Sequence, residues 1–195
     1  MRRITILSTL IALGLVAAMG RPTAQGNVAE IEHVKDNLYV IIGGGGNTAA
    51  LVTDGGVVVI DTKNPGWGDA ILTKIRTVTD KPVSMIINTH THGDHVGSNV
   101  DFLLPVEVVA HANTKANMER MEPFQSANGQ QYLPTQTYQD RLTLLDGDDR
   151  IDLYHFGAGH TSGDSIVVFP ALGVAHTGDL FAWKGVPYID VGNGG

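Results

Sequence analysis

The chain has 195 residues, with 13 Lys and Arg, 20 Asp and Glu, eight His and no Cys, and a formal net charge of −7. The length corresponds to about one domain, and 43% hydrophobic with 17% charged residues excludes a wholly disordered chain. The lack of Cys excludes disulfides, thiolate metal sites and a cysteine nucleophile. The acidic balance argues against a nucleic-acid partner, which would need basic patches.

The first 20 residues have the layout of a secretory signal peptide. Two arginines precede a mostly apolar stretch over residues 4–19, with small residues at positions 18 and 20. That stretch is shorter than the roughly 20 residues that a membrane span needs, so we expect no stable membrane anchor. The sequence predicts export to the periplasm or the medium, with cleavage after residue 20 or after residue 24.

The next part of the chain alternates predicted strands and helices. Apolar runs separated by Gly, Asn and Asp turns predict strands at 38–42, 49–53 and 57–60, with a hairpin turn at 54–56. The run of glycines at 43–46 lacks the Lys-Ser/Thr ending of a phosphate loop, so we interpret it as a flexible turn. An apolar stripe predicts a helix over 65–79. A strand at 83–88, a short helix at 99–104, a strand at 106–110 and a helix at 112–121 follow.

The second half is richer in strands. Residues 122–139 lack periodicity and predict a loop, either an ordinary surface loop or one that covers or lines a pocket. In the second case Gln125, Gln130, Gln131 and Tyr132 could contact a substrate. Apolar runs then predict strands at 142–145, 151–156, 166–169 and 173–175. The whole pattern predicts a mixed α/β chain with helices covering sheets.

Four metal-ligand side chains fall within six positions directly after the strand at 83–88. His90 and His92 are two apart, so on an extended segment they leave the same face. Gly93 lets the chain turn, so that Asp94 and His95 can reach a second point in space. This spacing suggests two metal ions side by side. Imidazole and carboxylate ligands suit zinc, iron or manganese, and zinc is the first choice for a histidine-rich site.

Two further pieces lie downstream. His160 stands in the glycine-rich loop at 157–164, directly after a predicted strand. Asp179 follows the strand at 173–175, and a carboxylate at a strand end can bridge two metal ions with its two oxygens.

The His-x-His-x-Asp-His motif, the Gly-His-Thr-x-Gly-Asp loop and the Thr-Gly-Asp strand end resemble the metallo-β-lactamase fold superfamily, over about residues 28–190. The resemblance implies an αββα sandwich of two mixed β-sheets flanked by helices, with the metals at one edge. It implies a first metal site of His90, His92 and His160, a second site with Asp94 and His95, a bridging Asp179, and Asp61 as a support of the metal loop. The incomplete metallo-β-lactamase-like domain would span residues 28–195.

The resemblance also calls for one more histidine for the second metal, late in the chain. No histidine follows His176, and residues 191–195 read as an interrupted loop. We therefore expect a fragment of a longer protein that lacks the C-terminal part of the second half. The alternative is a short protein with a half-filled second site.

The resemblance implies a metallo-hydrolase. Metal-bound hydroxide would attack an ester, thioester, lactone or amide carbonyl of a small molecule, and Asp94 would orient the nucleophile. A β-lactamase proper is one alternative: Asp179 argues against it and export argues for it. An iron-dependent redox enzyme and a non-catalytic metal-binding component are the others.

The remaining histidines have plainer interpretations. His33 is expected at the surface, and His155 and His176 are expected to be structural. His111 lies near a position where the resemblance places a pocket residue, and it is a candidate pocket contact only.

Overall fold

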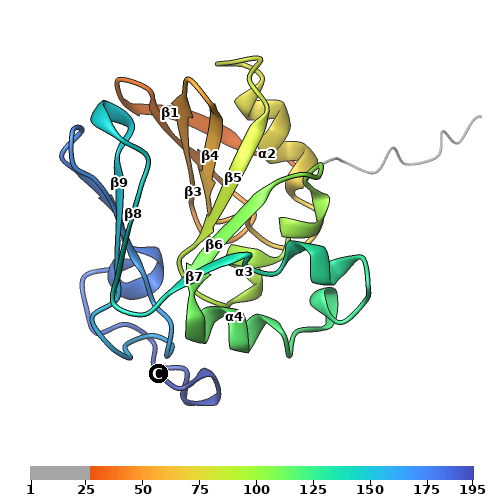
Figure 1. The fold of residues 1–195 in the computed structure, drawn as a ribbon, viewed down its shortest axis with the longest axis vertical. Coiled ribbons are helices and arrows are strands. Elements are labelled where there is room, and N and C mark those ends of the chain that lie inside the picture. The colour runs from red at the N-terminus through yellow and green to blue at the C-terminus, as the bar shows by residue number, and fades with distance from the viewer. Residues whose placement is uncertain (1–26) are drawn as a thin grey trace, which may run out of the picture.

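The computed structural model describes residues 27–195, so the predicted signal peptide and both cleavage points lie outside the described residues. Two β-sheets pack face to face, the strands from β1 to β7 forming one and the strands from β8 to β11 the other (Figure 1). The seven-stranded sheet follows the chain order: β1 (Glu30–Lys35), β2 (Leu38–Ile42), β3 (Thr48–Thr53), β4 (Gly56–Ile60), β5 (Val83–Asn88), β6 (Glu107–His111) and β7 (Gln136–Tyr138). The four-stranded sheet has the order β11 (Val174–His176), β10 (Ile166–Phe169), β9 (Ile151–Tyr154) and β8 (Arg141–Leu144).

The strand directions gather four chain segments at one edge of the sandwich. Strands β1 to β4 pair antiparallel, whereas β4 to β7 pair parallel, so the carboxyl ends of β4 and β5 lie together. In the other sheet β9 and β11 both run antiparallel to β10, so they also end on a common side. The carboxyl ends of parallel strands are where α/β proteins place their ligand sites.

Three α-helices are described: α2 (Gly68–Ile75), α3 (Gly93–Val96) and α4 (Ala112–Met118). Short 3-10 turns lie at Asn99–Asp101, Glu122–Phe124, Gly129–Tyr132, Gly147–Asp149, Gly178–Phe181 and Val191–Asn193. The α-helices lie on the side of the seven-stranded sheet that faces away from the second sheet (Figure 1). This is the two-sheet, helix-flanked architecture that the resemblance predicted. Within residues 27–195 the α-helices cover the large, mixed sheet, and the small sheet is antiparallel throughout rather than mixed.

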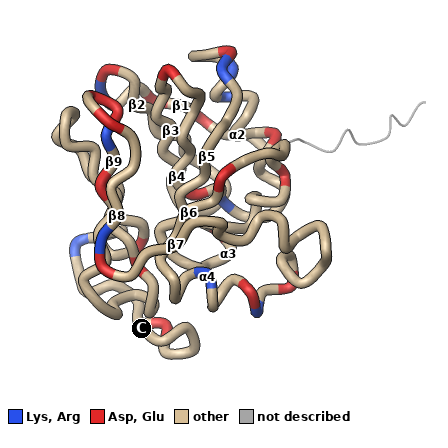
Figure 2. The backbone as a smooth tube through the Cα atoms, in the orientation of Figure 1, with Lys and Arg blue, Asp and Glu red and all other residues tan. Residues whose placement is uncertain are grey.

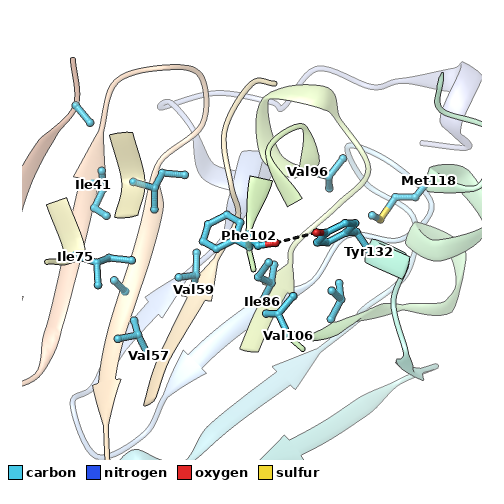
Figure 3. Packing of buried hydrophobic residues seen from close by; sticks show 14 of the residues in the cluster. Ile41, Val57, Val59, Ile75, Ile86, Val96, Phe102, Val106, Met118 and Tyr132 are labelled. Atoms are coloured by element: carbon cyan, nitrogen blue, oxygen red, sulfur yellow. Dashed lines mark hydrogen bonds between the residues drawn. The ribbon is translucent and has the colours of Figure 1, made fainter. Parts of the chain in front are cut away.

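Two apolar clusters hold the layers together, one on each face of the large sheet. The outer cluster joins Ile71 and Ile75 of α2 to Val57, Val59 and Ile86 of the sheet (Figure 3). The inner cluster fills the space between the sheets, where Val58 and Ile60 meet Leu153, Val167 and Phe169. Strand β4 contributes to both because alternate side chains point to opposite faces, so its run of five buried residues reads as continuously apolar.

Several predicted boundaries shift for local reasons. The helix predicted at 65–79 is α2 at Gly68–Ile75 only, because Gly66 has a left-handed φ of 79° just before it and Thr77, Val78 and Thr79 after it are β-branched. The helix predicted at 99–104 is a single 3-10 turn. The helix predicted at 112–121 ends at Met118, with Glu119 as its C-cap.

Residues 122–139 are more regular than the predicted loop. They contain two 3-10 turns and the seventh strand, β7. Phe124 and Tyr132 are buried in the outer cluster, and the Tyr132 hydroxyl donates a hydrogen bond to the Phe102 carbonyl (Figure 3). Tyr132 is therefore a packing residue rather than a substrate contact.

Charge is sparse in the centre of the molecule. Strands β3, β4 and β5 contain no Lys, Arg, Asp or Glu, and Figure 2 shows the charged positions mainly on outer strands, turns and helices. Across residues 27–195 we find no helix with the length and apolar character needed to cross a membrane.

Candidate metal centre

The site forms where β4, β5, β9 and β11 end. His90 and His92 follow β5, His160 stands in the loop after β9, and Asp179 follows β11. One ligand atom from each of these four residues lies within 4.8 Å of the others. Residues that are up to 89 positions apart in the chain thus converge as metal ligands would.

Each of the three histidines uses one ring nitrogen to donate to an acceptor outside the group. His90 Nδ1 lies 3.0 Å from the Thr89 hydroxyl, His92 Nε2 lies 2.6 Å from an Asp190 carboxylate oxygen, and His160 Nδ1 lies 2.6 Å from the Tyr188 carbonyl. A carbonyl and a carboxylate can only accept, so these bonds place the proton of His92 and His160 on the outer nitrogen. The other nitrogen is then a free lone pair, as in metal-bound histidines whose orientation is set by an outer partner.

The inner nitrogens are arranged as if around a cation. His92 Nδ1 and His160 Nε2 lie only 2.8 Å apart. His90 Nε2 is buried and has no hydrogen-bond partner among the described residues. Burial lowers the pKa of His90 well below its usual value, and the neighbouring histidines lower it further. The unpaired, buried nitrogen of His90 beside two closely spaced nitrogens of the other histidines fits a metal ion. We call His90, His92 and His160 the histidine half.

A second group adjoins it, and we call Asp94, His95 and Asp179 the carboxylate half. His95 Nε2 lies 3.2 Å from Asp179 and 3.7 Å from Asp94, and the His95 and His90 ring centres are 4.1 Å apart. Asp179 also lies 3.6 Å from His160, so its two oxygens face both halves. Burial alone would lower the pKa of His95, but the carboxylates of Asp61 and Asp179 outweigh it and raise this pKa to about 10. The hydrogen bond from His95 lowers the pKa of Asp179.

Asp61 is connected to both halves through hydrogen bonds. It follows β4, is fully buried, and accepts hydrogen bonds from the Thr89 amide, the Thr89 hydroxyl and His95 Nδ1 at 2.7–2.8 Å. Since Thr89 in turn accepts from His90, one carboxylate orients a histidine of each half. The structure places Asp61 where the resemblance expected a support of the metal loop.

Three residues at the site were not predicted from the sequence. Asp190 and Tyr188 lie just before the last 3-10 turn, Val191–Asn193, and reach His92 and His160 across 98 and 28 positions. Lys63 is buried two residues after Asp61. No local motif marks the first two, and a lysine in a turn usually points to solvent.

The other histidines lie outside the metal group. His33 is exposed and donates to the Asp36 carbonyl. His176 lies at the end of β11 and donates to the Asn47 carbonyl at 3.2 Å. His111 and His155 stack on one another with ring centres 3.8 Å apart, close to Tyr138, so His111 is buried in a packed pair.

A cavity of about 570 Å³ opens beside the carboxylate half. Its polar end is formed by Asp94, His95 and Asp179, and its walls include Leu38, Val40, Phe169, Val174 and Phe181. No Lys or Arg of residues 27–195 lines it, and none of residues 122–139 contributes to it. The pocket wall expected from 122–139 is thus formed instead by strands β2, β3, β10 and β11 and the turns that follow them.

The pattern of the family described as "Metallo-beta-lactamase superfamily" matches residues 41–193. The chain belongs to this superfamily. A relative named "Metallo-beta-lactamase type 2", from Elizabethkingia meningoseptica, is 31% identical in an alignment of 178 residues that covers 83% of this chain and 65% of the relative. The alpha subunit of 2,4-dinitroanisole O-demethylase from Nocardioides sp. (strain JS1661) is 31% identical over 71% of this chain and 42% of its own length. The chain thus spans about two thirds or less of these relatives.

Solved structures of the superfamily share the fold. The crystal structure of metallo-beta-lactamase IND-7 matches with a TM-score of 0.68 and 24% identity, over 83% of this chain and 77% of that chain. A double mutant of the sec-alkyl sulfatase PisA1 matches with a TM-score of 0.62 and 16% identity, over 76% of this chain and 31% of that chain. At such identities the likeness establishes the architecture and leaves the substrate open.

Proposed function

We propose that the protein is a metal-dependent hydrolase that uses two zinc ions and attacks an ester, thioester, lactone or amide carbonyl of a small molecule. The observation that carries this proposal is the set of inward-facing histidine nitrogens, each turned by an outer acceptor, beside the carboxylates of Asp94 and Asp179. Zinc suits ligands of this kind, and iron or manganese would be accommodated by the same atoms.

The residues divide the work. His90, His92 and His160 would hold the first ion, Asp94 and His95 the second, and Asp179 would bridge the two. When bound, the ions would lower the pKa of water and polarise the carbonyl of the substrate. Asp94 is the candidate catalytic residue because its side chain is 41% exposed and stands at the polar end of the cavity, where it can accept a proton from an attacking water.

The test is a hydrolysis screen of ester, thioester, lactone, amide and β-lactam substrates with the zinc-loaded protein. Asp94→Ala should lower the rate on the best substrate by at least about 100-fold. Asp69→Ala, an exposed acid on α2, is the matched control and should keep the rate. If Asp94→Ala stays folded and keeps full activity, Asp94 is not the catalytic residue, and if no substrate is turned over, the hydrolase proposal fails.

Two further features bear on the substrate and on the location of the protein. The 31% identity to a metallo-beta-lactamase favours β-lactams as the second candidate substrate, and the screen decides it directly.

The layout of residues 1–20 favours export to the periplasm or the medium. A reporter fused after residue 30 should leave the cytoplasm, and a reporter that stays inside would contradict export.

A further inference from the structure

Lys63 is a buried cation that the proposed chemistry does not use. Its side chain has no exposed surface. Its Nζ donates hydrogen bonds of 2.8 Å to the carbonyl of Ile41, in the strand before the glycine run, and to that of Gly46, the last glycine of the run. Burial lowers the pKa of Lys63 to about 8, and the nearby Asp61 carboxylate partly opposes this effect. A lysine withdrawn from water in this way needs a structural reason.

The glycine run lies directly against the carboxylate half. Gly43, Gly44 and Gly45 all have left-handed φ values, and the Gly46 amide donates to the Asp94 carbonyl at 3.1 Å. A Cβ added at Gly45 would lie 2.6 Å from the Asp94 Cβ, and one added at Gly46 would lie 2.3 Å from the His95 ring. The run is therefore a closely fitted wall rather than the flexible turn expected from the sequence.

The segment 61–64 ties this wall to the metal loop through four successive residues. Asp61 accepts from His95 Nδ1, and the Thr62 amide donates to the His95 carbonyl at 2.7 Å. Lys63 holds Gly46, and Asn64 donates to the Gly44 carbonyl from both its amide and its side chain. Asp61 and Lys63 both have left-handed φ values, 62° and 67°, which non-glycine residues adopt at an energetic cost. The buried hydrogen bonds of both side chains account for that conformation.

We propose that Lys63 is a positioning residue: its ammonium group fastens the Gly43–Gly46 wall against Asp94 and His95 and so sets the geometry of the carboxylate half. This inference rests on the proposed metal site for its functional meaning. Its structural part stands alone, because the contacts of Lys63 involve no ion. Removing the ammonium group leaves two buried carbonyls without their donor, and the wall loosens where it touches Asp94 and His95.

The experiment is amide hydrogen exchange on the metal-free full chain, comparing wild type with Lys63→Met and Lys63→Arg. Lys63→Met should speed exchange in peptides covering 43–47 and 93–97 by about tenfold, while β6 keeps its rate. Lys63→Arg, which can still donate to both carbonyls, should restore much of the protection. Lys81→Met is the matched control, because Lys81 also holds a backbone carbonyl, that of Thr53, but at a distant hairpin. The same rates in Lys63→Met and wild type, or an equal rise throughout the chain, would overturn the proposal.

Zinc affinity distinguishes a positioning role of Lys63 from a general contribution to folding. Only a positioning role makes the effect of Lys63→Met depend on Asp94 and His95. Lys63→Met should weaken binding that depends on Asp94 and His95 by about 10- to 100-fold, the usual effect of losing an outer support of a metal ligand. In an Asp94→Ala, His95→Ala background, Lys63→Met should leave zinc binding unchanged, and an equal loss in both backgrounds would contradict the proposal. If wild type binds no zinc, the proposed function fails while the exchange result still decides the role of Lys63. If Lys63→Met does not fold, Lys63→Gln should show the same localised loosening on a smaller scale.

Discussion

The histidine half and the carboxylate half of the centre are supported in different ways. Imidazoles alone form the histidine half, and their outer partners are a hydroxyl, a backbone carbonyl and the partly buried Asp190. The carboxylate half combines one imidazole with two carboxylates. Two buried charges support it: Asp61 accepts a hydrogen bond from His95, and Lys63 donates to the Gly46 carbonyl next to it. In the histidine half each outer nitrogen has a hydrogen-bond acceptor, so the inner nitrogens are already oriented to bind a cation. The orientation of the carboxylate half depends instead on buried charged side chains. We therefore expect the first ion to bind tightly at the histidines and the second to be more sensitive to distant changes.

The largest expected effect comes from removing a ligand of the histidine half. His160→Ala takes one of three inward nitrogens away and should lower zinc affinity by more than about 100-fold, because loss of an outer partner alone costs 10- to 100-fold. Isothermal titration with zinc measures it. His33→Ala, an exposed histidine bonded only to the Asp36 carbonyl, should bind zinc like wild type. Equal affinity in His160→Ala and wild type would remove His160 from the site.

Asp61→Asn comes next, because Asp61 serves both halves. The amide cannot accept all three hydrogen bonds that the carboxylate accepts, and a buried charged interaction is broken. We expect the free energy of unfolding to fall by about 3 kcal/mol, together with a loss of zinc affinity. Urea unfolding of the metal-free protein checks the first effect. A variant as stable as wild type would show that Asp61 is not the shared support.

Asp190→Asn should act on the histidine half alone and more weakly. The side chain keeps an oxygen that can accept from His92 Nε2, so we expect about a tenfold loss of zinc affinity, at the lower end of the range for outer partners. Hydrogen exchange at 43–47 should stay unchanged. A change there would contradict the separation of the two halves.

On the carboxylate side we also expect a pH dependence of stability, rather than a loss of zinc affinity. The pKa of Lys63 is lowered to about 8 in the fold, from an ordinary value of 10.5 in the unfolded chain. Between these values the unfolded chain binds more protons, so this residue's contribution to stability rises with pH from about 8 to about 10.5. Lys63→Met lacks this contribution. The difference in free energy of unfolding between wild type and variant should be flat from pH 6 to about 7 and rise above pH 8, and a constant difference would indicate an ordinary pKa for Lys63.

Much of the fold could be predicted because it rests on local pattern. Apolar runs between turn residues marked β2 to β6 and β8 to β11 within a residue or two. Two edge strands were missed. Strand β1 is mostly exposed and rich in charged residues, and the three residues of β7, Gln136–Tyr138, have no apolar periodicity. The superfamily is confirmed by the match over residues 41–193.

The candidate ligands His90, His92, Asp94 and His95 could be named because their spacing is local and their chemistry specific. His160 and Asp179 could be named only because the resemblance places them in the same site. Their supports were visible only in part. Asp61 could be placed from the resemblance, but the Asp190 contact depends on the chain returning over the site after 98 residues. The role of Lys63 depends on the glycine run folding onto Asp94 and His95, and the sequence alone favoured a flexible turn there. Contacts between residues far apart in the chain, and the burial of a charged side chain, cannot be predicted from a local sequence pattern.

The most direct test of the account is the metal content of the folded chain. Wild type, His90→Ala, His160→Ala and His33→Ala would be dialysed to equilibrium against zinc, and bound metal would be counted by elemental analysis. We predict at least one tightly bound ion per chain in wild type and His33→Ala and its loss in the other two. A wild type that retains no zinc, or retains as much as His90→Ala and His160→Ala do, would contradict the metal centre described above.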